Sequence, residues 1–184
     1  MEGTLLKFKP VVENPELVTT TIFNAVTEWV GICAKEEFLV AEIDPEFAGG
    51  VELCNKYNVN PMSGANCLVV EGRRGDKITY ASCLVPVGYR YDMSGVVRKA
   101  MNARTVSVAP LEFVLEQSQM EYGSITPIGL PKDWMLFIDP LVLKNERIII
   151  GGGFKKSKLS IPSSTLLSLP NAVQLDGMAK YVKM

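Results

Sequence analysis

The chain has 184 residues, of which 47% are hydrophobic and 21% charged, and its formal net charge is −1. This composition is typical of one globular domain, and the near-neutral charge means that any anionic partner must be bound by a local basic patch. The sequence contains no histidine, which excludes Ser-His-Asp triads, Cys-His dyads and histidine-ligated zinc.

The first predicted elements are a helix and a strand. Asn14 can cap a helix and Pro15 suits its first position, so we expect a helix over about 15–30. The apolar run at 38–43 predicts a strand. The N-terminus shows no signal peptide, and no apolar run is long enough to cross a membrane. We therefore expect a cytoplasmic protein that makes no contact with membranes.

The rest of the chain mixes strands and helices without strict alternation. Residues 66–72 and 77–87 flank a short turn and predict a β-hairpin. The other predicted elements are helices over 46–57, 92–101 and 110–118, strands over 105–109, 134–139, 146–152, 158–161 and 171–175, and a short helix that begins at Pro162. This pattern favours an α+β fold with a mixed, curled, barrel-like β-sheet flanked by helices.

The four cysteines are Cys33, Cys54, Cys67 and Cys83, and none belongs to a Cys-x-x-Cys pair. Each lies in an apolar context, so buried free thiols are the expected state. We predict no metal site and no cofactor. If the protein is an enzyme, it must use backbone dipoles, lysine, carboxylates or groups of its own substrate.

The segment EYGSITPIGLP, residues 121–131, has an unusual density of glycine and proline. Gly123 and Gly129 allow backbone geometries that other residues resist, while Pro127 and Pro131 fix φ and remove hydrogen-bond donors. Such a loop is either a plain turn or a cradle of backbone N–H groups held in place for a ligand oxygen.

This loop and its neighbours resemble the YbaK/prolyl-tRNA-synthetase-associated editing domain family. Residues 123–127 match the Gly-x-x-x-Pro loop of that family, Gly129 matches the glycine that follows it, and 148–153 match a later strand with a glycine pair. The resemblance implies an editing domain over about 38–178. It leaves residues 1–37 as an N-terminal helical extension and 179–184 as a C-terminal tail.

The resemblance implies a hydrolase that edits aminoacyl-tRNA in trans and so serves translation fidelity. In such a deacylase the glycine loop holds the ester carbonyl, and water attacks with help from the terminal ribose hydroxyl of the tRNA. No protein side chain acts as nucleophile. The implied partners are the aminoacylated 3′ end of a tRNA and possibly an aminoacyl-tRNA synthetase.

Two departures from the family pattern concern charge. Asn66 takes the place of the family lysine at the start of a strand, and Lys158 falls where some members carry aspartate. We hypothesise that Lys158 projects into the same pocket and restores the positive charge; the alternative is a solvated run of lysines. The catalytic candidates are Gly123, Ser124, Ile125, Thr126, Pro127, Asn66 and Lys158. The substrate-binding candidates are Gly129, Gly152, Gly153, Lys155, Lys156, Arg98 and Lys99.

Because the family lysine is replaced, three functions stay open. The first is a free-standing aminoacyl-tRNA deacylase. The second is a non-catalytic module that binds aminoacyl-tRNA or a synthetase, and the third is a binder of a small amino-acid-like ligand. A basic rim beside the pocket would separate the first two from the third, and turnover would separate the first from the second.

Overall fold

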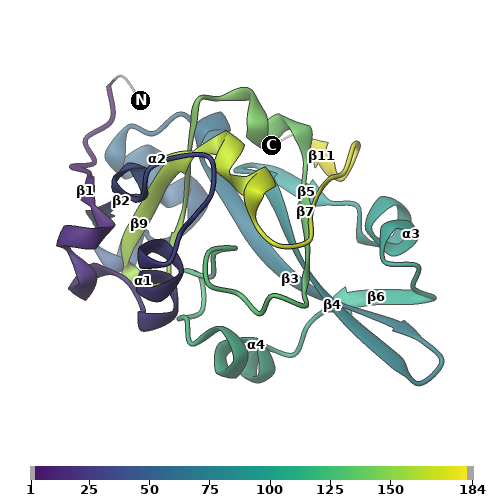
Figure 1. Cartoon of the computed structure of the whole chain (residues 1–184). Coiled ribbons are helices and arrows are strands. Elements are labelled where there is room, and N and C mark those ends of the chain that lie inside the picture. The colour runs from purple at the N-terminus through teal and green to yellow at the C-terminus, as the bar shows by residue number, and fades with distance from the viewer. Residues whose placement is uncertain (1–2, 182–184) are drawn as a thin grey trace.

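The fold is organised around a long hairpin. In the computed structural model, which describes residues 3–181, β3 (Ala65–Arg74) and β4 (Lys77–Pro86) are each ten residues long and pair antiparallel (Figure 1). The predicted hairpin is therefore present, and β3 extends two residues further toward the turn than expected.

Three further strands extend the hairpin into a five-stranded sheet with the order β10-β7-β4-β3-β6. β7 (Met135–Ile138) runs parallel to β4, and β10 (Ala172–Gln174) runs parallel to β7. At the other edge, β6 (Thr105–Val108) pairs only with residues 70–73 of β3. Residues 65–69 of β3 therefore pair with β4 along one edge, and no other strand within residues 3–181 pairs with them along the other edge.

A second sheet has four antiparallel strands in the order β1-β2-β9-β8. These are β1 (Lys9–Pro10), β2 (Leu39–Glu42), β9 (Phe154–Pro162) and β8 (Arg147–Gly152). A third sheet pairs β5 (Tyr89–Tyr91) with β11 (Ala179–Tyr181). The α+β class is confirmed, but the expected barrel-like curl is not supported, because none of these three sheets closes on itself.

Four α-helices flank the sheets. They are α1 (Thr20–Thr27), α2 (Gly50–Tyr57), α3 (Arg98–Ala100) and α4 (Leu111–Ser118). Short 3-10 helices lie at Val11–Glu13, Pro15–Leu17, Lys35–Glu37, Pro45–Phe47, Pro61–Ser63, Pro140–Lys144 and Ser163–Ser168, and a π-helical turn at Met93–Val97 precedes α3.

The helix predicted over 15–30 is broken in the structure. The segment Pro15–Leu17 forms a 3-10 turn, Val18 and Thr19 are extended, and α1 starts only at Thr20. Side chains branched at Cβ follow one another from Val18 to Ile22. Because such side chains lose rotamer freedom in a helix, the run favours an extended start.

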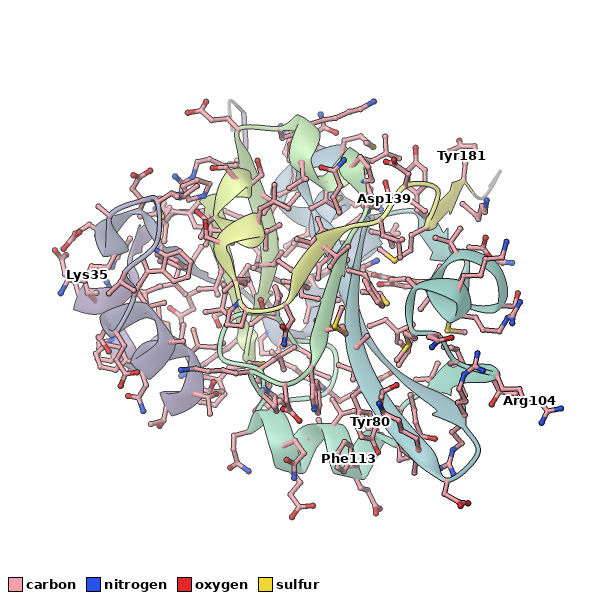
Figure 2. All side chains as sticks on the ribbon, turned by 45° about the vertical axis from the view of Figure 1, so that its right-hand side comes forward. Lys35, Tyr80, Arg104, Phe113, Asp139 and Tyr181 are labelled. Atoms are coloured by element: carbon pink, nitrogen blue, oxygen red, sulfur yellow. The ribbon has the colours of Figure 1, made fainter. Side chains whose placement is uncertain are left out.

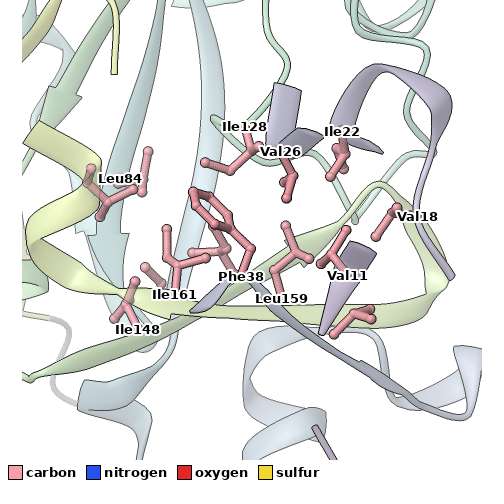
Figure 3. Close-up of a cluster of buried hydrophobic side chains, with 14 of the residues drawn as sticks. Val11, Val18, Ile22, Val26, Phe38, Leu84, Ile128, Ile148, Leu159 and Ile161 are labelled. Atoms are coloured by element: carbon pink, nitrogen blue, oxygen red, sulfur yellow. The ribbon is translucent and has the colours of Figure 1, made fainter. Parts of the chain in front are cut away.

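The main core joins the N-terminal segment to the four-stranded sheet. Val11, Ile22 and Val26 are fully buried and pack in one cluster with Leu159 and Ile161 of β9 (Figure 3). The division into an extension, a main domain and a tail remains a prediction. Residues 1–2 of the predicted extension and residues 182–184 of the predicted tail lie outside the described residues.

None of the helices within residues 3–181 has the length and apolarity that crossing a membrane requires. Over the same range, no group of three or more His, Cys, Asp or Glu side chains is placed to hold a metal ion. The four cysteines are free thiols, of which Cys54 and Cys83 are buried and Cys33 and Cys67 are partly exposed.

Candidate active site

A cavity of about 400 Å³ opens beside the unpaired start of β3. Its walls come from the start of α2, the first half of β3, the end of β6, α4, the loop at 122–125, and the β8–β9 pair. Among the residues predicted to be catalytic, Asn66, Gly123, Ile125 and Lys158 line this cavity. Residues far apart in the sequence therefore meet in one place.

The glycine loop presents alternate residues to the cavity. Gly123 has φ +81°, a left-handed conformation that favours glycine, and it lines the cavity together with Ile125. Ser124 and Thr126 point away from it and are fully buried. The Ser124 N–H donates to the Glu121 carbonyl (3.0 Å), and the Thr126 N–H donates to the Met120 sulfur (3.4 Å).

The N–H groups of Gly123 and Ile125 differ from those of Ser124 and Thr126, because the first two have no hydrogen-bond acceptor among residues 3–181. The loop can therefore offer a ligand oxygen these two N–H donors, while those of Ser124 and Thr126 hold the loop in shape. The hydroxyl groups of Ser124 and Thr126 are buried and have no partner within the described part of the chain.

Gly151 on β8 fixes the position of the loop. A Cβ atom at this residue would lie 2.4 Å from the Ser124 carbonyl oxygen and 2.7 Å from that of Ile125. Any other residue would push the loop away from the sheet. The Gly153 N–H also donates to the Ser124 carbonyl at 2.9 Å, which ties the loop to the end of β8.

Lys158 lies directly across from Gly151 in the β8–β9 register. Its side chain is only 6% exposed, and its ammonium group donates to the Ala48 carbonyl at 2.8 Å. No carboxylate within residues 3–181 forms an ion pair with it. Burial lowers the pKa of Lys158 from 10.5 to about 8. A buried cation without an acidic partner is suited to bind an anionic or carbonyl oxygen.

The start of α2 adds to this positive end of the cavity. Ala48, Gly49 and Gly50 line it, and Gly49 offers no side-chain cap to the free N–H groups of the first turn. Gly50 also lets Asn66 come close, since a Cβ atom there would lie 2.8 Å from the Asn66 side-chain oxygen.

The Cys67 thiol and the Tyr91 phenol at the cavity are poor nucleophiles. Burial raises the pKa of the Cys67 thiol to about 12, and burial raises the pKa of the Tyr91 phenol well above its ordinary value. Both groups are therefore protonated at neutral pH, and no Asp or Glu lines the cavity. The arrangement can bind and polarise an oxygen atom, and neither Cys67 nor Tyr91 is suited to covalent attack.

The opposite wall is apolar. Leu68, Val108, Leu111 and Val114 line it, and Val108 and Leu111 are 55% and 47% exposed at the mouth. These residues come from separate elements, so no local pattern in the sequence could predict them. The Gly49-Gly50 pair is the one visible signal that points to the α2 side of the cavity.

Several predicted residues lie outside the cavity lining. Pro127 borders a small hollow near Trp134, and Gly129 packs closely against the Thr21 backbone of α1. Gly152 forms the bulge of β8 against Ser157 of β9.

Gly153 and the four predicted basic residues are also absent from the lining. Gly153 packs against α1. The Lys155 ammonium lies 5.9 Å from the ring centre of Tyr122, a cavity residue, so Lys155 is near the rim, with Lys156 next to it on β9. Arg98 and Lys99 lie on α3, away from this rim.

Comparisons with known proteins identify the family of the chain. The family model of the aminoacyl-tRNA editing domain matches residues 44–169, which is more than half of the chain. No curated protein sequence gives a significant match. Among solved structures, a proposed trans-editing enzyme for prolyl-tRNA synthetase is 18% identical, with a TM-score of 0.71 over 90% of this chain and 99% of that one.

Two further solved structures share the fold. A hypothetical protein is 17% identical, with a TM-score of 0.68 over 78% of this chain and 91% of that one. A scaffold from a study of computational epitope grafting is 17% identical, with a TM-score of 0.72 over 88% of this chain and 96% of that one. At these identities the likeness concerns the fold alone.

Proposed function

Because the chain belongs to the aminoacyl-tRNA editing domain family, as its sequence indicated, we propose that it hydrolyses the ester of mischarged tRNA in trans. The observation that carries the proposal is one cavity lined by Gly123 and Ile125 of the loop and by the buried cation of Lys158. The proposed partners are the aminoacylated 3′ end of a tRNA and the synthetase that charges it, in the cytoplasm.

The first step of the proposed mechanism is recognition of the ester carbonyl. Its oxygen accepts hydrogen bonds from the N–H groups of Gly123 and Ile125, the two loop donors without an acceptor among the described residues. A fixed donor aimed at a developing oxyanion contributes about 3–4 kcal/mol. Lys158 adds positive charge at the same end of the cavity and so takes over the task of the family lysine, which is Asn66 in this chain.

The second step is attack by water. The water oxygen bonds to the carbonyl carbon, the bond from that carbon to the ribose oxygen breaks, and the water proton ends on the ribose oxygen. The neighbouring ribose hydroxyl positions the water. An aminoacyl ester is already activated, so no protein nucleophile is needed, and the protonated states of Cys67 and Tyr91 support this view.

A second candidate is a module that binds aminoacyl-tRNA or a synthetase without cleaving the ester. The neutral Asn66 in place of the family lysine favours it, because this position no longer supplies charge to the ester. A binder of a small amino-acid-like ligand is the third candidate.

The experiment is a deacylation assay with the purified protein and a panel of charged tRNAs. The panel holds proline-specific tRNA charged with alanine, tRNAs charged with serine or cysteine, and correctly charged controls. We expect hydrolysis of mischarged tRNA and at least about tenfold slower turnover in Gly123→Ala, because alanine resists the left-handed backbone by about 1–2 kcal/mol. Gly88→Ala is the matched control, since Gly88 has φ +86°, open space around it and no place in the cavity.

Each outcome separates the candidates. Binding of charged tRNA without turnover would favour the non-catalytic module. A protein that neither binds nor cleaves charged tRNA would favour the small-ligand binder, and equal effects of Gly88→Ala and Gly123→Ala would contradict the loop mechanism.

A further inference from the structure

Four exposed cations gather where the β3–β4 turn meets the segment between α3 and β6. We call Arg74, Lys77, Lys99 and Arg104 the basic corner. Arg74 lies opposite Lys77 across the hairpin. Its guanidinium donates to the Asn102 carbonyl at 2.5 Å and to the Asn102 side chain at 2.9 Å. The Arg104 N–H donates to the Arg73 carbonyl at 2.7 Å, and the Asn102 N–H donates to the Lys99 carbonyl at 3.0 Å. Arg74, Lys77 and Asn102 line one small hollow, so the four residues come from adjoining backbone segments.

The positive charge of the basic corner is not neutralised by the protein. Within residues 3–181 the ion pairs join Arg73 to Glu71, Arg147 to Glu37, and Lys180 to Asp92, and none includes a residue of the basic corner. Asp76 at the hairpin turn is the nearby exposed acid. The protein as a whole has a net charge of −1, so this is a local concentration of positive charge.

Strand β6 connects the basic corner to the cavity. Arg104 directly precedes it, and Val108 at its end lines the cavity. Four residues of extended strand span about 13 Å. β6 is an edge strand, and Thr105 and Ser107 expose their hydroxyl groups along it. An extended ligand strand that leaves the cavity can therefore follow these hydroxyl groups to the basic corner.

The rim of the cavity formed by α4 and the start of the glycine loop carries negative charge. Glu112 and Glu116 are exposed on α4, and Glu121 is exposed just before the glycine loop. Lys155 lies beside Glu121, whose carboxylate accepts the Lys155 N–H at 2.6 Å. Since carboxylates repel phosphate groups, a polyanion that occupies the cavity is directed away from α4 and toward β6.

We propose that the basic corner docks the phosphate backbone of a tRNA acceptor stem, while the single-stranded 3′ end follows β6 into the cavity. The proposal rests on the proposed function and adds where the duplex lies and how it is oriented. Duplex RNA is gripped mainly through its phosphates and shape, which scattered Arg and Lys side chains can recognise without base contacts. Figure 2 shows that Arg104 and Lys35 lie at opposite ends of the molecule, which provides a distant control surface.

The test compares two double charge reversals. Lys77→Glu with Arg104→Glu changes the basic corner, and Lys7→Glu with Lys35→Glu makes the same charge change elsewhere. None of these four exposed side chains forms a hydrogen bond or ion pair within the described residues. The substrates are alanine-charged proline tRNA and alanyl-adenosine, an ester without a tRNA body.

We expect the basic-corner variant to lower kcat/KM on the charged tRNA at least tenfold and the Lys7/Lys35 variant to lower it less than threefold. Hydrolysis of alanyl-adenosine should stay within twofold in both. Binding of wild type to tRNA should also weaken more steeply with salt than binding of the basic-corner variant. Equal losses in the two variants, or no loss on tRNA, would overturn the proposal.

The two proposals can fail separately. If wild type cleaves neither ester, the proposed function fails, and the docking surface is then tested with uncharged tRNA in a fluorescence titration. At least tenfold weaker binding by the basic-corner variant alone would support the surface. Equal binding by wild type and both variants would overturn the docking proposal and would indicate that the basic corner does not bind RNA.

Discussion

The β8–β9 pair holds a cation near each end, and the protein treats the two in opposite ways. Arg147 lies opposite Pro162, and Lys158 lies opposite Gly151. The Arg147 guanidinium donates to the Glu37 carbonyl (2.5 Å), the Ser160 carbonyl (2.9 Å) and the Ser160 hydroxyl (3.2 Å). These hydrogen bonds stay within the protein, and the bond to Glu37 joins β8 to the segment before β2.

Lys158 is more buried than Arg147 and has fewer partners. Within residues 3–181, the Ala48 carbonyl is its one hydrogen-bond acceptor. Its remaining ammonium hydrogens are available to a ligand in the cavity. Arg147, with three hydrogen bonds to the protein, thus serves the fold, whereas Lys158, with one, has donors to spare beside a cavity, as the proposed binding of a carbonyl oxygen requires.

The largest expected effect is the loss of turnover in Lys158→Met. Removing a charged group from a developing oxyanion should slow deacylation of mischarged tRNA by roughly a hundredfold or more. Methionine fills the space without charge, so the variant should still fold. Lys35→Met, at the far end of the molecule, is the control in the same assay. Turnover within threefold of wild type would place Lys158 outside the mechanism.

A related prediction concerns stability and pH. The pKa of Lys158 falls from 10.5 to about 8 on folding, so between these values the unfolded chain binds more protons, and the free energy of unfolding rises with pH. Below pH 8 the charged lysine costs about 3 kcal/mol of stability. In urea titrations, the stability of Lys158→Met relative to wild type should therefore fall by about 3 kcal/mol from pH 7 to pH 10.5, on top of a pH-independent loss from the missing donor to the Ala48 carbonyl. A difference that does not change with pH would contradict the burial of an unpaired cation.

Arg147→Met should lose stability but keep turnover, whereas Lys158→Met should lose turnover. It removes the three hydrogen bonds from the guanidinium to the Glu37 carbonyl, the Ser160 carbonyl and the Ser160 hydroxyl, so the free energy of unfolding of Arg147→Met should fall by about 2 kcal/mol. Turnover per folded molecule should stay within threefold, because Arg147 does not line the cavity. Urea unfolding and the deacylation assay on the same preparation check both parts. A large loss of turnover without a loss of stability in Arg147→Met would show that Arg147, like Lys158, acts in the reaction rather than in the fold.

Glu37→Gln should have the smallest effect. The ion pair between Glu37 and Arg147 is long, at 3.7 Å, and the Glu37 side chain is 51% exposed. Such a pair contributes about 0.5 kcal/mol or less. If the variant loses as much stability as Arg147→Met in the same urea titration, the charge of Glu37 matters more than the carbonyl groups do.

Much of the fold could be predicted because long strands carry clear patterns. The hairpin over 66–72 and 77–87 and the strand over 38–43 appear close to their expected positions. β1, β5 and β11 have only two or three residues each and were not predicted, because so short a strand gives a weak periodic pattern, although the equally short β10 lies within the strand predicted over 171–175. The absence of barrel closure could not be predicted either, because it depends on how distant strands pair.

The candidate site was predictable where its residues match a family pattern, as in the 123–127 loop, at Asn66 and at Lys158. Gly123 and Ile125 belong to one recognisable loop, but the pattern could not tell that Ser124 and Thr126 turn inward. That alternation depends on contacts with Met120 and with β8, which the loop sequence does not contain. The apolar wall is assembled from β3, β6 and α4, so only the folded chain brings it together.

The most direct test of the central claim is a crystal structure with 3′-alanylamino-3′-deoxyadenosine, whose amide replaces the ester and resists hydrolysis. The central claim is that the glycine loop and Lys158 bind the same acyl group. We expect the amide carbonyl oxygen to lie about 2.7–3.1 Å from the Gly123 and Ile125 nitrogen atoms, with the Lys158 ammonium directed at the ligand. An analogue bound with its carbonyl away from both the loop and Lys158, or bound outside the cavity, would show that the loop and Lys158 do not bind the acyl group.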